Sequence, residues 1–146
     1  MEQVFELLTA EYLFDPQGQG ELFTKDDDHM AQIIELMGDV PMEVKMGGKY
    51  SRELFDHIGN FHFHPCASLT DIPILGALRY IRTLKFWPLK RVMIEKYLYT
   101  ETESIALCGF LEPMLAVDMR ERAYARDMKN HKWLQLRDTD GPVIDW

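Results

Sequence analysis

The segment from Thr24 to Pro41 constrains the fold of this chain more than any other. Apolar residues recur at positions 30, 33, 34 and 37, which is the i, i+3, i+4, i+7 spacing of an amphipathic helix. The run Asp26-Asp27-Asp28 precedes them, where a helix dipole favours negative charge. Gly38 is a typical helix terminator, and Pro41 is expected to prevent a restart. The segment therefore predicts a helix over 29–37 that begins under a cap of aspartates.

Further helical patterns follow along the chain, and no stretch alternates convincingly as a strand. Apolar spacing and turn residues predict helices over 4–8, from 87 onward, over 104–115 and over 124–130, with a short helical turn at 51–55. The fold class predicted from these patterns is mainly α.

Charge and apolar content exclude several classes of protein. The 146 residues carry 16 basic and 24 acidic side chains, a net charge of −8, which argues against a nucleic-acid binder and favours a basic partner. No stretch approaches the roughly 18 apolar residues of a membrane helix, and the first residues lack a signal pattern. Two cysteines, Cys66 and Cys108, are too few for a disulfide scaffold. These features predict one intracellular domain without a membrane partner.

Short motifs in a fixed order carry a family resemblance. They are Phe5-Glu6-Leu7-Leu8-Thr9, Tyr12-Leu13-Phe14-Asp15-Pro16, Phe23-Thr24-Lys25-Asp26-Asp27-Asp28-His29, Gly48-Lys49-Tyr50-Ser51, Leu78-Arg79-Tyr80-Ile81, Trp87-Pro88-Leu89, Ile94-Glu95-Lys96-Tyr97, Phe110-Leu111-Glu112-Pro113-Met114-Leu115 and His131-Lys132-Trp133-Leu134. Together they resemble the lower half of the C-terminal lobe of the SR-protein kinases, a family of serine/threonine kinases. The likeness extends from Val4 to Leu136 except for one block.

The resemblance implies a truncated kinase C-lobe with an inserted loop: a partial kinase domain over 1–136 and a tail over 137–146. The family phosphorylates Arg-Ser-rich splicing factors with ATP and magnesium in the cytoplasm and nucleus. This sequence has no Gly-rich phosphate loop, His-Arg-Asp or Asp-Phe-Gly, so we expect no catalytic residue and no cofactor in the chain itself. Two alternatives stay open: a non-catalytic module that docks arginine-rich peptides, and the non-functional product of an imperfect gene model.

The resemblance also implies a groove that binds arginine-rich substrate segments away from the active site. Its positions fall on Glu11, Leu13, Asp28, Glu35, Trp87 and Lys96. Asp28 and Glu35 are seven residues apart, so they share one helix face and can present a strip of negative charge. Carboxylates bind guanidinium groups bidentately, so this strip suits arginine-rich ligands. The alternative is a solvated helix face with no ligand.

Arg122 matches the arginine with which kinases anchor a glutamate of an Ala-Pro-Glu motif, and this sequence lacks that motif. An unpaired buried charge is costly, so we expect Arg122 to be solvated or to pair with other groups. A plain surface arginine is the alternative.

The block that departs from the family is Asn60 to Ala77, either a natural loop extension or translated intron sequence. Its His62, His64 and Cys66, with His57, raise the possibility of a zinc site, but the spacing matches no compact zinc motif. We therefore predict no metal, and we expect Cys108 to be a buried core thiol and Trp133 a packing residue.

Overall fold

The computed structural model describes residues 2–56 and 76–135, and these are mainly helical. Their helices are α1 (Glu2–Thr9), α2 (Lys25–Met37), α3 (Met42–Gly47), α4 (Ser51–Leu54), α5 (Leu89–Glu95), α6 (Glu101–Leu115), α7 (Ala125–Met128) and the 3₁₀ turn η1 (Lys132–Leu134). An isolated antiparallel bridge between Phe55 and Leu78 is the only strand pairing among the described residues. The predicted class is thus confirmed at the level of mainly α.

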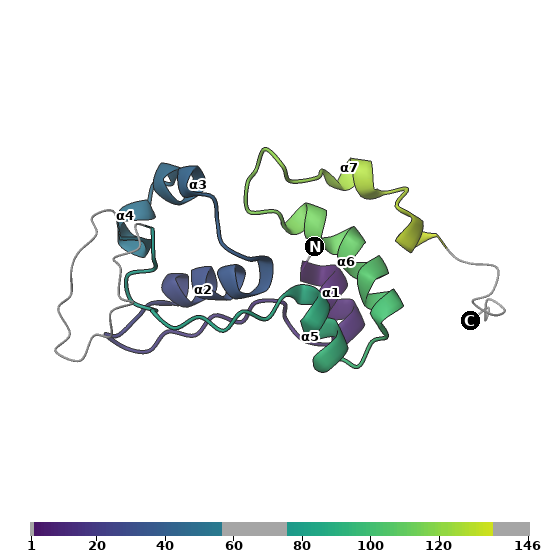
Figure 1. Cartoon of the computed structure of the whole chain (residues 1–146), viewed down its shortest axis with the longest axis horizontal. Coiled ribbons are helices and arrows are strands. Elements are labelled where there is room, and N and C mark those ends of the chain that lie inside the picture. Colours follow the sequence, from purple (N-terminus) through teal and green to yellow (C-terminus); the bar gives the residue numbers. More distant parts are fainter. Residues whose placement is uncertain (1, 57–75, 136–146) are drawn as a thin grey trace, which may run out of the picture. The chain divides into compact units, whose positions relative to one another are not determined.

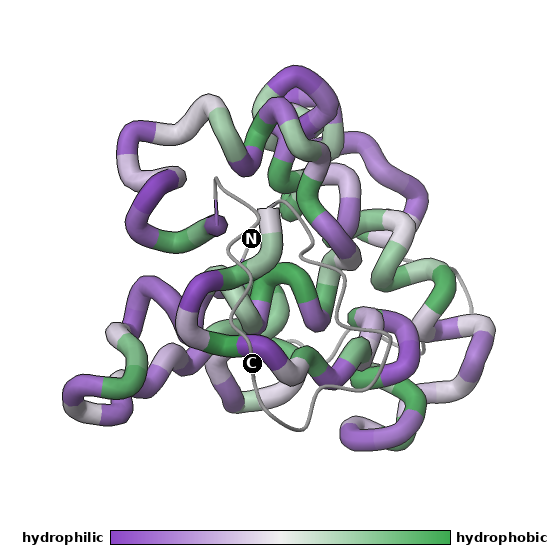
Figure 2. Tube along the Cα trace, turned by 60° about the vertical axis from the view of Figure 1, so that its left-hand side comes forward, coloured by the Kyte–Doolittle hydropathy of each residue, from purple (hydrophilic) through white to green (hydrophobic). Residues whose placement is uncertain are grey.

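The chain divides after Pro88 into two compact units, which we call the α2 unit (residues 2–88) and the α6 unit (residues 89–135). Figure 2 shows hydrophobic and hydrophilic residues interspersed within the described segments of both, as expected for amphipathic elements. The assignment of residues 1–136 to one partial kinase domain stays a prediction.

In the α2 unit, α2 is the central element, and the extended segments before it and after position 77 run along it (Figure 1). Thr24 is the N-cap and forms a capping box with Asp27, whose side chain is buried. The helix therefore begins four residues before its predicted start at residue 29, and the three aspartates lie within its first turn rather than before it. Gly38, at φ +90°, ends the helix with its N–H on the Ile34 carbonyl oxygen.

The prediction for Pro41 was wrong, because α3 begins at the next residue. The first turn of a helix needs no backbone N–H from its leading residues, so a proline can precede it at no cost in hydrogen bonds. Gly76, the first described residue after position 56, packs against Met42 and Lys45 of α3. Gly76 has φ +80°, and a Cβ there would lie 3.0 Å from Met42 Sδ, so any other residue would be strained at this position.

In the α6 unit, α5 packs against α6, and both contribute fully buried side chains, among them Leu89, Met93, Leu107 and Leu111. Helix α6 begins at Glu101, three residues before its predicted start, because Thr100 forms a capping box with Glu103. The predicted helix over 124–130 is limited to the four residues of α7.

Residues 57–75 and 136–146 lie outside the described chain. The predicted tail falls there, and so does the insert apart from Gly76 and Ala77. The described helices include none that is long and apolar enough to cross a membrane.

Candidate functional site

Helix α2 carries the two carboxylates at the centre of the predicted docking strip. Asp28 lies in its first turn and Glu35 near its end, and both side chains are half-buried. Asp27, between the capping threonine and Asp28, is used by the cap and is not part of the strip: its Oδ2 accepts hydrogen bonds from Thr24 N and Oγ1 at 2.8 and 2.7 Å.

The Asp28 carboxylate binds the extended segment that precedes α2. Its Oδ2 accepts hydrogen bonds from the Gln17 backbone N–H at 2.8 Å and from Gln32 Nε2 at 2.9 Å. Gln32 in turn accepts the Asp15 backbone N–H at 3.1 Å through its Oε1. Asp28 therefore helps to hold residues 15–17 beside the helix.

Glu35 plays the corresponding part for the segment that leads away from position 77. Its Oε1 accepts the Lys85 backbone N–H at 2.6 Å, and its own carbonyl oxygen accepts the Trp87 N–H at 3.0 Å. Trp87 is half-buried, and Lys85 Nζ lies 5.9 Å from the centroid of its ring. The structure thus brings Glu35 and Trp87 together, as the docking hypothesis requires.

Glu11 and Leu13 lie in the extended segment after α1. Glu11 is exposed, and its backbone N–H donates to Thr9 Oγ1 at 3.3 Å; Leu13 is half-buried. Lys96, the sixth predicted residue, follows α5 in the α6 unit, where its ammonium lies 5.0 Å from the Tyr97 ring centroid. Five of the six predicted docking residues therefore belong to the α2 unit, and Lys96 does not.

Sequence reasoning missed Gln17 and Gln32, which orient the Asp28 side chain. A signal for Gln32 was present, because it lies four residues after Asp28, and an amide and a carboxylate at that spacing on a helix are within hydrogen-bond distance.

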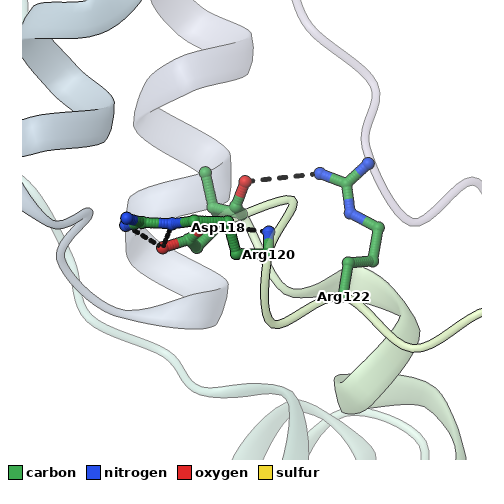
Figure 3. A network of polar contacts seen from close by, with 4 residues as sticks. Asp118, Arg120 and Arg122 are labelled. Carbon is green, nitrogen blue, oxygen red and sulfur yellow. Dashed lines mark hydrogen bonds and ion pairs between the residues drawn. The ribbon is translucent and has the colours of Figure 1, made fainter.

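Arg122 is exposed and binds backbone carbonyls beyond the end of α6. Its Nε donates to the Ala116 oxygen at 2.7 Å and its Nη2 to the Val117 oxygen at 3.4 Å. Figure 3 shows the Arg120 and Arg122 guanidinium groups on opposite sides of Asp118. The hydrogen bonds from the Arg120 side chain and backbone lower the pKa of Asp118 to about 2. Arg122 in this arrangement stabilises the chain after α6.

Neither thiol chemistry nor a metal site is supported in the described residues. Burial, and secondarily the negative charge of Glu112, raises the pKa of Cys108 to about 12, so its thiol is protonated at neutral pH. Within residues 2–56 and 76–135, no group of three His, Cys, Asp or Glu side chains is placed to hold a metal ion. His57, His62, His64 and Cys66 lie outside the described chain.

Comparisons with known proteins give a consistent set of relatives, although no family model matches the chain. It is 43% identical over 138 residues to serine/threonine-protein kinase SKY1 of Saccharomyces cerevisiae, covering 94% of this chain and 16% of that protein. It is 41% identical over 132 residues to protein kinase dsk1 of Schizosaccharomyces pombe, covering 90% of this chain and 21% of that kinase. It is 38% identical over 130 residues to human SRSF protein kinase 3, covering 89% and 20%. The chain therefore spans about a fifth or less of the length of these relatives.

Proposed function

Since the chain corresponds to a part of an SR-protein serine/threonine kinase, we propose that this part is the lower half of the C-terminal lobe and that it docks arginine-rich peptides. The docking surface, which we call the acidic strip, consists of Glu11, Leu13, Asp28, Glu35 and Trp87 of the α2 unit.

The geometry of the two central carboxylates carries this proposal. Asp28 and Glu35 are half-buried on α2 and are held by backbone N–H groups of the two flanking extended segments. These bonds use Asp28 Oδ2 and Glu35 Oε1. Among the described residues, no hydrogen bond or ion pair involves the second oxygen of either carboxylate. Each carboxylate is therefore fixed in place and still has an acceptor for an incoming guanidinium group.

The expected affinity is modest because each contact is partly exposed. A charge-assisted hydrogen bond at such a site contributes about 0.5–1.5 kcal/mol, so several together give micromolar binding at best. The net charge of −8 attracts a basic peptide from a distance. Added salt weakens the binding steeply, since charges are screened within about 10 Å at 0.1 M.

The other parts of the proposal follow from the family. The whole kinase phosphorylates serines of Arg-Ser-rich splicing factors with ATP and magnesium, in the cytoplasm and the nucleus. The present chain contains no Gly-rich phosphate loop, His-Arg-Asp or Asp-Phe-Gly, so by itself it binds no nucleotide and transfers no phosphoryl group.

A titration of a fluorescent Arg-Ser peptide tests the docking function. We compare the wild-type chain with an Asp28→Asn, Glu35→Gln double variant, which removes two charges but keeps an oxygen acceptor for the Gln17 and Lys85 N–H groups. The matched control is Glu21→Gln with Asp26→Asn, which removes two charges from exposed side chains outside the strip.

The expected result is a loss of affinity of about tenfold or more for the strip variant and less than about twofold for the control at low salt. Equal affinities for the two double variants contradict the docking proposal and leave Asp28 and Glu35 as a solvated helix face.

A further inference from the structure

A glutamine at the centre of α2 joins the Asp28 carboxylate to the extended segment before the helix. Gln32 is half-buried, and both ends of its amide are used. Its Nε2 donates to Asp28 Oδ2 at 2.9 Å and to the Asp15 carbonyl oxygen at 3.3 Å, while its Oε1 accepts the Asp15 N–H at 3.1 Å.

Gln17 closes this network on the other side. Its backbone N–H donates to the same Asp28 Oδ2 at 2.8 Å, and its Nε2 donates to Asp15 Oδ1 at 2.9 Å. Asp28 Oδ2 thus receives two N–H groups, one from its own helix and one from a segment 11 residues earlier. Two donors on one oxygen restrict the rotation of the carboxylate about its χ torsions.

We propose that Gln32 is a positioning residue of the acidic strip: it fixes the Asp28 carboxylate for an incoming guanidinium group. This inference rests on the proposed docking function and names a residue through which that function operates.

The physical basis is preorganisation. A carboxylate that is already held loses less conformational entropy when it binds a ligand, so the same contacts give a higher affinity. The neutral amide of Gln32 suits this position because it donates to Asp28 without neutralising its charge. A glutamate there would place two like charges four residues apart on one helix and would repel Asp28.

A double-mutant cycle tests whether Gln32 acts through Asp28. The 146-residue chain is titrated with the fluorescent Arg-Ser peptide in four forms: wild type, Gln32→Met, Asp28→Asn and the double variant. Methionine has a similar length and helix propensity but lacks the amide, so the helix itself is preserved. The Gln19→Met variant is the matched control, because Gln19 is exposed and its side chain takes part in no hydrogen bond described for this chain.

The expected result is that Gln32→Met weakens peptide binding by about three- to tenfold in the wild-type background and by less than about 1.5-fold when Asp28 is already asparagine. Gln19→Met leaves the affinity unchanged. Circular dichroism checks that each variant is folded, and Gln32→Ala replaces Gln32→Met if that variant fails to fold.

Two other outcomes overturn the inference in different ways. If the wild-type chain binds the peptide but Gln32→Met has no effect, or has the same effect in both backgrounds, the positioning role is refuted and the docking function stands. If the wild-type chain shows no saturable binding, the docking function itself fails, and the role of Gln32 fails with it.

Discussion

In the α2 unit, two side chains of α2 bind backbone groups that are far away in the sequence, whereas in the α6 unit bonds between side chains and backbone join close neighbours. The Glu35–Lys85 and Gln32–Asp15 hydrogen bonds span 50 and 17 residues. In the α6 unit, the Thr100–Glu103, Asp118–Arg120 and Arg122–Ala116 bonds span three, two and six residues.

The difference shows how each unit keeps its shape. In the α2 unit, extended segments without helical hydrogen bonds of their own are placed by carboxylates and amides of α2. In the α6 unit, helices satisfy their own backbone and are held by apolar side chains, with Leu89, Met93 and Leu111 fully buried. A polar surface built by the first arrangement can bind a ligand, and an apolar interface built by the second is suited to stability.

The largest expected effect comes from a cavity in the α6 unit. Leu111→Ala removes a fully buried side chain, and we expect it to lower the free energy of unfolding of that unit by about 2–4 kcal/mol. Urea denaturation gives the free energy, and hydrogen exchange by mass spectrometry assigns the loss to a unit. Ile105→Ala is the control, because Ile105 is on the same helix and 54% exposed. Similar losses for the two variants contradict the assigned packing.

Much of the helical architecture could be predicted from the sequence, because α2 carries a full amphipathic repeat between a capping threonine and a glycine terminator. Most of the errors arose at helix starts, although the helix predicted over 124–130 also ends early, at Met128. The Thr100–Glu103 capping box is visible in the sequence and places the start of α6 correctly. The start of α3 was missed because Pro41 was interpreted only as a helix breaker.

The site was predictable only in part. Spacing places Asp28 and Glu35 on one helix, but no local pattern identifies Gln17 or Lys85 as their backbone partners, because these contacts depend on the path of extended segments. Lys96 was grouped with the strip on resemblance, and the structure places it in the α6 unit.

The next effect concerns the alkaline stability of the α6 unit. Burial raises the pKa of Cys108 from 9.0 to about 12. A raised pKa in the folded state means that the contribution to stability is complete below pH 9 and is lost as the pH rises from 9 towards 12, at no more than about 1.4 kcal/mol per pH unit. We expect the difference in urea midpoint between wild type and Cys108→Val to shrink, or to reverse, as the pH rises from 8 to 11. Tyrosines, lysines and Cys66 are present in both proteins and cancel in the comparison. A difference in urea midpoint that does not change with pH therefore contradicts the raised pKa of the buried thiol.

A smaller effect separates the side-chain hydrogen bond of Glu35, to the Lys85 N–H, from its backbone hydrogen bond, to the Trp87 N–H. Glu35→Ala removes the acceptor of the Lys85 N–H but not that of the Trp87 N–H, which binds the backbone oxygen of Glu35. The lost bond contributes about 1 kcal/mol, so amide exchange at Lys85 is expected to accelerate by about fivefold. Trp87 serves as the internal control, and Glu35→Gln, which keeps an acceptor, is expected to preserve the protection. Unchanged exchange at Lys85 in Glu35→Ala contradicts the long-range role of this carboxylate.

The smallest effect belongs to the local ion pair after α6. Hydrogen bonds from the Arg120 side chain and backbone lower the pKa of Asp118 from 3.8 to about 2. A lowered pKa in the folded state means that the contribution to stability is present above pH 3.8 and is lost as the pH falls towards 2. Arg120 is exposed and only two residues away, so solvent screens the pair and we expect its effect on unfolding to be slight.

An NMR titration of the Asp118 side-chain carboxyl carbon measures the shift in pKa directly. The pKa is expected to be about 2 in the wild-type chain and to return towards 3.8 in Arg120→Gln, while Arg126→Gln, which alters a looser surface pair, leaves it unchanged. An Asp118 that titrates alike in the wild type and Arg120→Gln would mean that the loop after α6 is held by Arg122 on the carbonyls of Ala116 and Val117 rather than by this pair.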